Sequence, residues 1–402
     1  MLTTEAAKAA IAKAMPDFGS EAVAYTSAAG RVLRQAVVAE RDQPPFDRVT
    51  MDGIAVSFDA LSRGVASFRI AGTQHAGDPV LTLSDDMSCI EVMTGAVLPA
   101  GSDCVIPVER ISLTNGSVDI EPGYRAERHQ FVHPQGSDHR QGTEVISPGA
   151  ILTPAEIAIV ASCGLTSVEV GKAPVVRVIS TGNELVPPGE PILQHQIRSS
   201  NGPALVAMLK GQGFRDCRHE HLRDDPDALR IEIARHLAEA QVMILSGGVS
   251  MGQADFVPQV LADLGVATIF HKISQRPGKP MWFGIGKEGQ AVFALPGNPV
   301  STLVCCRHYV LPALLDACGR NEHAVEWAVL TEEVTFKADL TFFMPVRLHN
   351  DVDGTLRAHP VPTNTSGDFT ALGGTDGYVE LAREQSYFAQ GSPVLLHRWS
   401  LP

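Results

Sequence analysis

Strand-like apolar runs and helix-like periodic segments alternate along the chain from residue 173 to residue 322. The run Val242–Leu245 has four consecutive apolar residues, a pattern typical of a strand that is buried on both faces. Further strand-like runs are VVRVIS, RHEHL, ATIFHKI and QAVFAL, and amphipathic segments such as PALVAMLKGQG separate several of them. This alternation predicts a three-layer α/β domain with a parallel sheet.

Polar or glycine-rich loops follow these runs, with the sequences STGNE, LRDD, SGGVS, ISQRPGKP and LPGNP. In an open parallel sheet, ligands bind beyond the carboxyl ends of the strands, where such loops meet. We therefore expect the loops to lie along one edge of the sheet and to form the functional site.

Two helices are predicted outside this region. Residues 1–40 begin with an Ala-rich helix capped by Thr3 or Thr4 and continue as extended segments. Residues 139–172 contain a helix whose cap is Thr153, followed by a proline and an acidic first turn.

Short β patterns fill the remaining parts of the chain. Residues 41–138 contain the runs FRIAG, CIEVMTG, CVIPVE and SVDIEP between turn residues. Residues 323–402 contain alternating or β-branched runs and a hairpin signal at Asp353-Gly354. The sequence thus predicts a mostly β domain before the α/β domain and a small β domain after it.

Composition narrows the class of protein. The formal net charge is −13, with 45 acidic and 32 basic residues, so broad binding to nucleic acid or to an anionic membrane is disfavoured. The 7 cysteines form no C-x-x-C pair, which suits a reducing compartment. No segment resembles a signal peptide or approaches the ~20 apolar residues of a membrane span. We expect a soluble, cytoplasmic protein.

The glycine-rich turn SGGVSMG admits three interpretations. Gly247 and Gly248 let the backbone approach a ligand closely, which suits an anion. A second interpretation is a purely structural tight turn. The third is a hydrolase nucleophile elbow, because the turn matches G-x-S-x-G with Ser250 as the nucleophile. No local signal identifies the acid and His that a hydrolase requires.

The turn LPGNPVS is a second candidate anion site. Pro296 stiffens it, while Gly297 and Asn298 tolerate unusual backbone angles. A helix beginning near Val300 would offer N–H groups to an anion, with Ser301 as a further donor. The alternative is a rigid connector between a strand and a helix.

The loop HKISQRPGKP brings Lys272, Arg276 and Lys279 together in an otherwise acidic chain, which suits an oxyanion.

Carboxylates follow turns or strand ends elsewhere, and few His or Cys residues accompany them. Such hard oxygen ligands indicate Mg²⁺ rather than zinc. The carboxylates are Asp52, Asp138, Glu184, Asp224, Asp225 and Asp255. Of these, Asp225 precedes Pro226 and is best explained as a helix cap.

An ordered set of segments resembles the MoeA and gephyrin E-domain family of molybdopterin molybdenumtransferases. The segments are PPFDRVTMDGIAV, VMTGAVLPAG, QGSD, STGNEL, IRSSN, RDDP, SGGVSMGQADF, RPGKP and LPGNPVS. The resemblance implies an elongated homodimer of multidomain subunits with a three-layer α/β molybdopterin-binding core. The implied domains are a discontinuous linking domain (1–40 and 139–172), a mostly β domain (41–138), the α/β domain (173–322) and a C-terminal β domain (323–402).

The resemblance also assigns roles to residues. The implied catalytic residues are Asp52, Thr94, Asp138, Glu184, Asp224 and Asp255. The implied metal ligands are Glu184, Asp224 and Asp255. The implied substrate-binding residues are Thr181, Gly247, Gly248, Ser250, Lys272, Arg276, Lys279, Pro296, Gly297, Asn298, Ser301 and Ser366. In the family's dimer, Asp52, Thr94 and Asp138 would act across the subunit interface.

The activity implied by the resemblance is Mg²⁺-dependent transfer of molybdenum from molybdate to adenylylated molybdopterin, with release of AMP. One alternative is a molybdopterin-binding scaffold without catalysis, and another is a molybdopterin adenylyltransferase, which uses the same α/β module. The retained carboxylates favour catalysis, and the additional β domains favour insertion. Partners would include a molybdopterin adenylyltransferase and proteins that mature molybdoenzymes, but neither nucleic acid nor a membrane.

Overall fold

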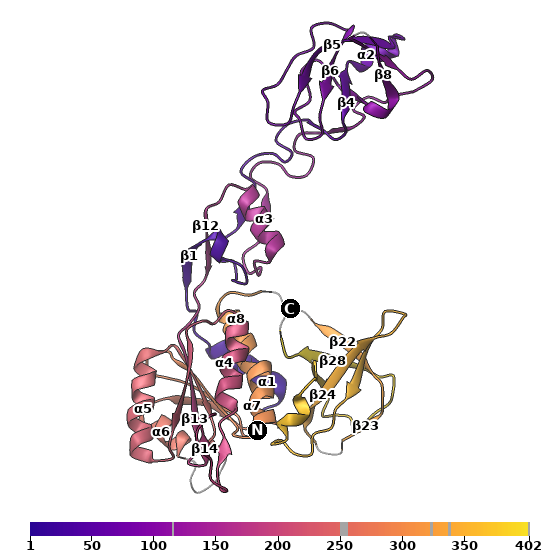
Figure 1. The fold of residues 1–402 in the computed structure, drawn as a ribbon. Helices are drawn as coiled ribbons and strands as arrows, with labels where there is room; N and C mark the ends of the chain where they lie inside the picture. Colours follow the sequence, from indigo (N-terminus) through magenta and orange to yellow (C-terminus); the bar gives the residue numbers. More distant parts are fainter. Residues whose placement is uncertain (115, 250–255, 322–324, 337–338, 401–402) are drawn as a thin grey trace. The chain divides into compact units, whose positions relative to one another are not determined.

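A computed structural model describes residues 1–402 except 115, 250–255, 322–324, 337–338 and 401–402 (Figure 1). Its described part forms two compact units. The core unit consists of Met1–Gln35, Pro148–Ile157 and Ser167–Pro402. The insert unit consists of Ala36–Ser147 and Ala158–Thr166. No helix among the described residues is long and apolar enough to cross a membrane.

The insert unit is built on a mixed sheet with the strand order β7-β4-β6-β5-β9-β8. The strands predicted from FRIAG, CIEVMTG, CVIPVE and SVDIEP are confirmed, and β4 and β8 add to them. The sheet strands are β4 (Gly53–Val56), β5 (Ser67–Gln74), β6 (Ser88–Val92), β7 (Cys104–Pro107), β8 (Ile111–Thr114) and β9 (Ser117–Ile120). Smaller elements are β2 (Val37–Val38), β3 (Arg48–Val49), α2 (Phe58–Ser62), η2 (Val108–Arg110), β10 (Val132–His133) and β11 (Glu144–Ile146).

Gly53 starts the interior strand β4 at a position where a side chain has no room. A Cβ atom there would lie 1.9 Å from the carbonyl oxygen of Ile106 on β7. We expect Gly53→Ala to force the two strands apart and to destabilise the insert unit by about 3 kcal/mol. Thermal unfolding followed by circular dichroism tests this expectation. Gly211→Ala is the control, because no atom lies within 4 Å of its added Cβ; equal melting temperatures for both variants would contradict the prediction.

Both predicted helices are present, the first within the core unit and the second beginning in the core unit and ending in the insert unit. Helix α1 (Thr4–Ala14) is capped by Thr3, whose hydroxyl accepts a hydrogen bond from the Ala6 N–H at 3.2 Å. In α3 (Pro154–Ser162), the predicted cap is confirmed, since the Thr153 hydroxyl accepts from the Ala155 N–H at 3.3 Å and the Thr153 N–H donates to Glu156 at 2.9 Å. The other elements here are β1 (Ser20–Ala24), η1 (Tyr25–Ser27) and β12 (Ser167–Gly171), and β1 pairs with β12.

The α/β part of the core unit contains a sheet with the strand order β16-β13-β17-β21-β20-β18. Its first four strands run parallel, as predicted. The strands are β13 (Val176–Thr181), β16 (Cys217–Leu222), β17 (Val242–Ser246), β18 (Ala267–His271), β20 (Trp282–Ile285) and β21 (Ala291–Leu295). A small side ladder joins β14 (Leu185–Val186) to β15 (Ile197–Arg198).

One strand departs from the predicted all-parallel sheet. β20 runs antiparallel to both β18 and β21. The sequence did not indicate this strand because it is short, contains Gly284 and follows a proline-rich loop. Since β18 is antiparallel to β20, its carboxyl end still points to the same edge as that of β21.

Helices cover both faces of this sheet, which makes the predicted three layers (Figure 1). Leu229 and Ile233 of α5 and Leu261 of α6 are buried against one face. Leu205 and Leu209 of α4 are buried on the other face, together with α1. These helices are α4 (Asn201–Gly211), α5 (Pro226–Glu239) and α6 (Val257–Asp263).

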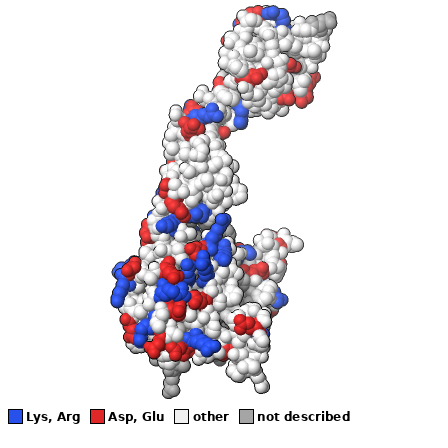
Figure 2. Space-filling view, turned by 60° about the vertical axis from the view of Figure 1, so that its left-hand side comes forward, with Lys and Arg blue, Asp and Glu red and all other residues white. Residues whose placement is uncertain are grey.

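The outer surface of the layer formed by α5 and α6 is mixed in charge. Figure 2 shows basic and acidic side chains intermingled there rather than a continuous basic area. Arg235 of α5 lies 2.9 Å from Glu220 and 2.7 Å from Glu232. Arg230 lies 3.2 Å from Asp263 of α6.

The helix predicted to begin near Val300 is present but changes geometry in its middle. It consists of α7 (Pro299–Cys305), a π-helical segment η3 (Cys306–Val310) and α8 (Leu311–Ala317). In the π segment, the Leu311 N–H donates to the carbonyl of Cys306, five residues earlier. Pro312 explains the change, because its ring lacks an N–H and would clash with a carbonyl of a regular α-helix.

The C-terminal part of the core unit is a small barrel. Strand pairs β24–β25, β25–β22, β22–β28, β28–β26 and β26–β24 close the ring, and β19 from the α/β part pairs with β24. The predicted hairpin at Asp353-Gly354 joins β24 and β25. The elements are β19 (Gln275–Arg276), β22 (Glu326–Leu330), β23 (Val334–Thr335), β24 (Thr341–Asn350), β25 (Leu356–Pro360), η4 (Phe369–Leu372), β26 (Gly377–Leu381), β27 (Tyr387–Phe388) and β28 (Pro393–Arg398).

Candidate functional site

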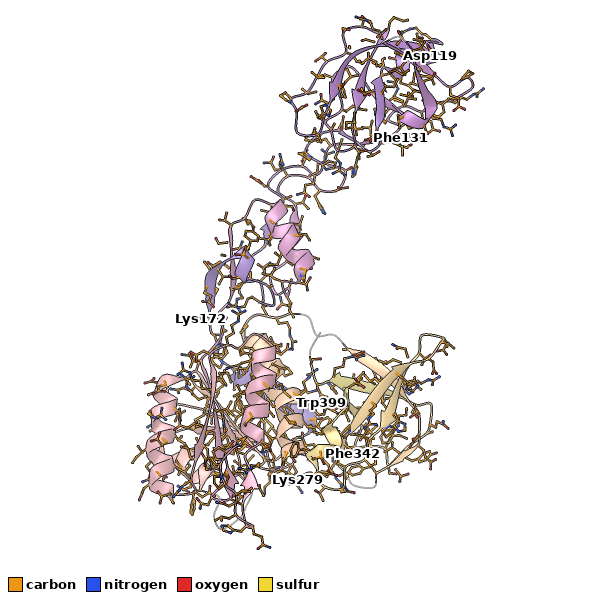
Figure 3. All side chains as sticks on the ribbon, viewed as in Figure 1. Asp119, Phe131, Lys172, Lys279, Phe342 and Trp399 are labelled. Atoms are coloured by element: carbon orange, nitrogen blue, oxygen red, sulfur yellow. The ribbon has the colours of Figure 1, made fainter. Side chains whose placement is uncertain are left out.

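The predicted loops meet at the carboxyl edge of the α/β sheet. At the ends of the parallel strands, Thr181 lies opposite Leu222, Ser180 opposite Ser246, and Ser246 opposite Leu295. The loops that follow these strands therefore lie in a row. They contain Glu184, Asp224, the paired glycines of the SGGVS turn, and the LPGNP turn. Lys279, in the cationic loop, lies at the lower end of the α/β part in Figure 3.

Glu184 and Asp224 come from neighbouring loops. The Asp224 N–H donates to the side-chain oxygen of Asn183 at 3.2 Å, which ties the two loops together. Nε2 of His221 lies 2.8 Å from the carbonyl of Gly182 and forms a second tie. The Glu184 carboxylate folds back over Gly182, where a Cβ would lie 2.7 Å from its oxygen. The two carboxylates thus come from adjacent, linked loops of the edge.

The glycine turn leaves no space for side chains. Gly247 and Gly248 have positive φ angles of 101° and 66°. A Cβ on Gly247 would lie 2.6 Å from the carbonyl oxygen of Thr181, and a Cβ on Gly248 would lie 3.0 Å from its hydroxyl. That hydroxyl is buried and has no hydrogen-bond partner among the described residues. An unpartnered buried hydroxyl beside two bare glycines is a feature that a ligand can satisfy.

The LPGNP turn lies against the glycine turn and contacts the C-terminal barrel. A Cβ on Gly297 would lie 3.5 Å from the Cα of Gly247. The Asn298 side chain donates to the hydroxyl of Ser366 at 2.6 Å, so Ser366 is brought to this edge. The Val300 N–H donates to the Ser366 carbonyl at 3.1 Å. This N–H is therefore not open to an anion, although the sequence predicted that it would be. Pro296 precedes these residues, and Ser301 is buried in the first turn of α7.

Asn201 is the residue at this edge to which the sequence assigned no role. Its amide nitrogen lies 2.7 Å from the Gly297 carbonyl, 2.9 Å from the Ser246 hydroxyl and 3.2 Å from the Thr302 hydroxyl. Because the amide has only two N–H groups, one of these contacts is shared. Asn201 thus joins the start of α4 to the end of β17 and to the LPGNP turn. Its place in IRSSN, within the family-like segments, was the available signal.

The cationic loop is folded back on itself. The Lys272 N–H donates to the carbonyl of Met281 at 2.8 Å, and the Ile273 N–H donates to that of Lys279 at 2.9 Å. These bonds hold the two lysines on one short hairpin. The guanidinium of Arg276 lies over the rings of Phe336 and Phe342, 5.7 and 5.8 Å from their centroids. Arg276 is therefore positioned by stacking on the C-terminal barrel.

Asp52 and Thr94 lie together in the insert unit. Both the N–H and the hydroxyl of Thr94 donate to the same Asp52 oxygen, each at 2.6 Å. These bonds lower the pKa of Asp52 below its ordinary value, and the bond from the Thr94 hydroxyl has the larger effect. The carboxylate is exposed and stays ionised.

Asp138 is held by a neighbouring imidazole in the same unit. Nε2 of His133 lies 3.0 Å from the Asp138 carboxylate, and an N–H of Arg48 lies 3.1 Å from Nδ1 of the same ring. Since arginine can only donate, Nδ1 accepts, and the Nε2–H donates to Asp138. The structure thus groups Asp52 with Thr94, and Asp138 with His133.

Thr94→Val removes the first of the two bonds to Asp52. We expect the pKa of Asp52 to rise towards its ordinary 3.8, because only the backbone N–H then stabilises the carboxylate. A lowered carboxyl pKa stabilises the fold above the unfolded-state value and loses that effect as pH falls through the folded-state value. In the variant, the folded-state pKa lies closer to the unfolded-state value, so Asp52 contributes less to stability and the pH range over which that contribution is lost becomes narrower. NMR titration of the carboxyl carbons measures the pKa of Asp52. Asp353, whose pKa is lowered chiefly by the Thr355 N–H, is the unaffected internal control. An unchanged Asp52 pKa in the variant would contradict the assignment.

Two predicted site residues, Ser250 and Asp255, lie outside the described residues. Apart from these, the carboxyl edge collects the predicted residues Thr181, Glu184, Asp224, Gly247, Gly248, Lys272, Lys279, Pro296, Gly297, Asn298 and Ser366. Asp225 is the predicted helix cap, because its carboxylate accepts from the Ala228 N–H at 2.8 Å.

Comparison with known proteins matches the whole arrangement. Residues 2–164 match the MoeA N-terminal region (domain I and II), residues 177–316 a probable molybdopterin binding domain, and residues 327–399 the MoeA C-terminal region (domain IV). A molybdopterin molybdenumtransferase from Synechocystis sp. is 38% identical over 400 residues, covering 99% of this chain and 100% of the relative. The chain belongs to the molybdopterin molybdenumtransferase (MoeA) family. The predicted resemblance and fold class are thereby confirmed.

Other members of the molybdopterin molybdenumtransferase family agree. A relative of that name from Synechococcus elongatus is 33% identical and covers 93% of both chains. The solved structure of a molybdopterin biosynthesis MoeA protein from Pyrococcus horikosii has a TM-score of 0.81, 29% identity and full coverage of both chains. The family architecture, a mostly β N-terminal domain, a molybdopterin-binding core and a C-terminal domain, therefore describes this chain, and it is a family of enzymes.

Proposed function

We propose that this chain transfers molybdenum from molybdate to adenylylated molybdopterin, with release of AMP, in molybdenum cofactor biosynthesis. The observation that carries the proposal is the gathering, at one edge of the sheet, of oxygen donors, a bare glycine turn and two lysines. A substrate with phosphates and an oxyanion needs all three kinds of group. Family membership along the full chain supports the same substrate.

Mg²⁺ fits the donors at this edge. Glu184 and Asp224 supply carboxylate oxygens, which Mg²⁺ prefers. The imidazole of His221, the nearby nitrogen donor, is engaged by the Gly182 carbonyl. We propose that Glu184 and Asp224 hold the ion together with Asp255. Bound there, Mg²⁺ would neutralise charge on the phosphate oxygens of the substrate.

The residues of the chain then act mainly by positioning and electrostatics. The glycine turn lets the phosphates approach the backbone, and the Thr181 hydroxyl is available as a donor to them. Lys272 and Lys279 provide positive charge for phosphate and molybdate oxygens. Water or a molybdate oxygen attacks the phosphoanhydride while these groups stabilise the developing charge. We propose that Ser366 of the barrel and Asn298 of the LPGNP turn, which are hydrogen-bonded to each other, contact the molybdate.

We also propose a homodimer, in which Asp52, Thr94 and Asp138 of one subunit act on substrate bound by the other. The fixed, ionised carboxylate of Asp52 is suited to orient an attacking oxygen. Sedimentation equilibrium tests the dimer, and a monomer at micromolar concentration would contradict it. A molybdopterin adenylyltransferase would supply the substrate, and maturation proteins in the cytoplasm would accept the product.

The test is direct. Purified protein is incubated with adenylylated molybdopterin, molybdate and Mg²⁺, and both AMP and molybdenum-loaded pterin are quantified. We expect both products to appear together and to depend on each component. Binding of the adenylylated pterin without AMP release would indicate a scaffold instead. Formation of adenylylated molybdopterin from ATP would indicate an adenylyltransferase.

A further inference from the structure

A second cluster of possible ligands lies in the core unit, where the π segment meets the C-terminal barrel. His308 comes from the π segment, Glu380 from β26 and His397 from β28. Their ring nitrogens and carboxylate oxygen all lie within 4.8 Å of one another. Nε2 of His397 lies 3.0 Å from a Glu380 oxygen, and Nε2 of His308 lies 4.0 Å from the same oxygen. None of these residues belongs to the carboxyl-edge site.

The environment of His308 is unusual for a purely structural residue. Its side chain is 1% exposed, and its Nε2 has no hydrogen-bond partner among the described residues. Its other nitrogen, Nδ1, lies 3.0 Å from the Tyr378 hydroxyl, which fixes the ring. Whichever nitrogen carries the proton, Nε2 is left with either an N–H or a lone pair that nothing satisfies, at a cost in free energy. A cation between Nε2 and Glu380 would remove that cost.

Three further features fit a metal rather than a packed core. Metal-bound imidazoles usually have their second nitrogen hydrogen-bonded, as Tyr378 provides for His308. Burial lowers the pKa of both His308 and His397, which favours the neutral imidazole that binds a metal. Finally, π segments in helices occur frequently at functional sites, and His308 lies in one.

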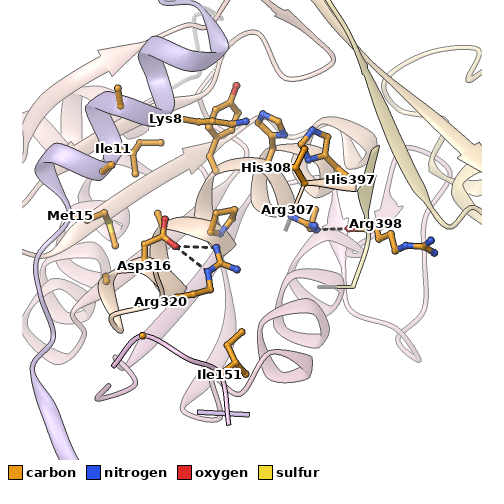
Figure 4. Close-up of a pocket in the computed structure, with 18 of the residues that line it drawn as sticks. Lys8, Ile11, Met15, Ile151, Arg307, His308, Asp316, Arg320, His397 and Arg398 are labelled. Carbon is orange, nitrogen blue, oxygen red and sulfur yellow. Dashed lines mark hydrogen bonds and ion pairs between the residues drawn. The ribbon is translucent and has the colours of Figure 1, made fainter. Parts of the chain in front are cut away.

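Two residues of the cluster, His308 and His397, line a cavity of about 1300 Å³ (Figure 4). Lys8 of α1 extends toward His308 in this cavity (Figure 4), and its ammonium interacts electrostatically with Glu380. Lys8 therefore places a positive charge beside the carboxylate when no metal is bound. The cavity provides solvent space beside the two imidazoles.

We propose that His308, Glu380 and His397 bind one divalent metal ion of the zinc class, with water from the cavity as the fourth ligand. Two imidazoles and one carboxylate are a donor set that zinc favours in tetrahedral sites. Binding replaces the hydrogen bond between His397 and Glu380, and the ring proton of His397 moves to Nδ1 through solvent. Because its ligands come from a core helix and two barrel strands, the ion fixes the barrel against the α/β part.

The test uses the full chain stripped of metal with a chelator and then titrated with Zn²⁺ by calorimetry. We expect one ion per chain and a higher melting temperature with Zn²⁺, since binding stabilises the folded state. Co²⁺ in place of Zn²⁺ should give the visible absorption of a tetrahedral site. His397→Gln and Glu380→Gln should each weaken Zn²⁺ binding by at least about tenfold and abolish the thermal shift.

Two variants serve as controls, and one should act in the opposite direction. His359→Gln removes an exposed barrel imidazole, and His236→Gln removes one from the separate Glu220, Glu232 and His236 group; neither should change binding. Lys8→Met should tighten Zn²⁺ binding, because it removes a repelling charge. Absence of Zn²⁺ binding, or equal affinity in His397→Gln and the unaltered chain, would overturn the proposal. None of these measurements depends on molybdenum transfer.

Discussion

Asp224→Asn is expected to lower molybdenum transfer by about 100- to 1,000-fold, because it removes one of the carboxylates proposed to hold the Mg²⁺ that neutralises charge on the reacting phosphate. The backbone N–H of this residue is bonded to Asn183, so the exchange of a carboxylate for an isosteric amide leaves the loop in place. The thermal unfolding temperature should therefore stay unchanged. AMP release at saturating substrate and at increasing Mg²⁺ measures the effect, and the variant should need more Mg²⁺ than the unaltered chain to reach its maximal rate.

The neighbouring residue supplies a matched control. Asp225 caps α5 through the Ala228 N–H, and Asn caps a helix as well as Asp does. Asp225→Asn should retain full activity and stability, whereas Asp225→Ala should lose about 1 kcal/mol of folding free energy with little effect on turnover. If Asp224→Asn and Asp225→Asn were equally active, the proposed ligand role of Asp224 would be wrong.

The sequence predicted the fold where local pattern and tertiary environment agree. The run Val242–Leu245 reads as a doubly buried strand, and all of β17 is buried. The caps Thr3, Thr153 and Asp225 lie directly before helices, and the side chain of each accepts a hydrogen bond from a backbone N–H of the first turn. These features depend on residues close together in the chain, so a single sequence contains the necessary information.

The departures arise from contacts that local pattern does not encode. β20 is an interior strand only because β18 and β21 flank it. The π segment follows from Pro312, which periodicity alone does not separate from a regular helix. Arg276 was predicted from charge as an anion ligand, but its stacking on Phe336 and Phe342 depends on a ring pair that forms only in the fold. Its role with an anion stays a prediction.

The candidate site likewise combines features that the local sequence predicts with features that depend on contacts between distant residues. Strand order determined which loops meet, and because the carboxyl ends of parallel strands share an edge, STGNE, LRDD, SGGVS and LPGNP could be placed together in advance. Asn201 could not be placed, because its partners Ser246, Gly297 and Thr302 are 45, 96 and 101 residues away in the chain. Residues that connect loops, rather than contact ligands, have no local signature.

Asn201→Asp should therefore have the second large effect on transfer. The change turns a donor into a carboxylate that faces the Gly297 carbonyl at 2.7 Å and two hydroxyls in a half-buried setting. We expect a loss of about 2 kcal/mol or more in folding stability from the unpaired charge. Displacement of the LPGNP turn should lower AMP release by about 100-fold, since small misplacements in a positioned site have effects of that size.

Asn321→Asp separates this explanation from a general effect of added negative charge. The Asn321 amide also donates to a backbone carbonyl, that of Pro148 at 3.1 Å, but the residue is exposed and lies outside the carboxyl edge. Its substitution should leave transfer unchanged, because solvent can hydrate the new charge. Asn201→Ser, which keeps one small donor, should fall between the unaltered chain and Asn201→Asp. If Asn201→Asp retained normal AMP release despite its lower stability, Asn201 would support the fold of α4 rather than the geometry of the site.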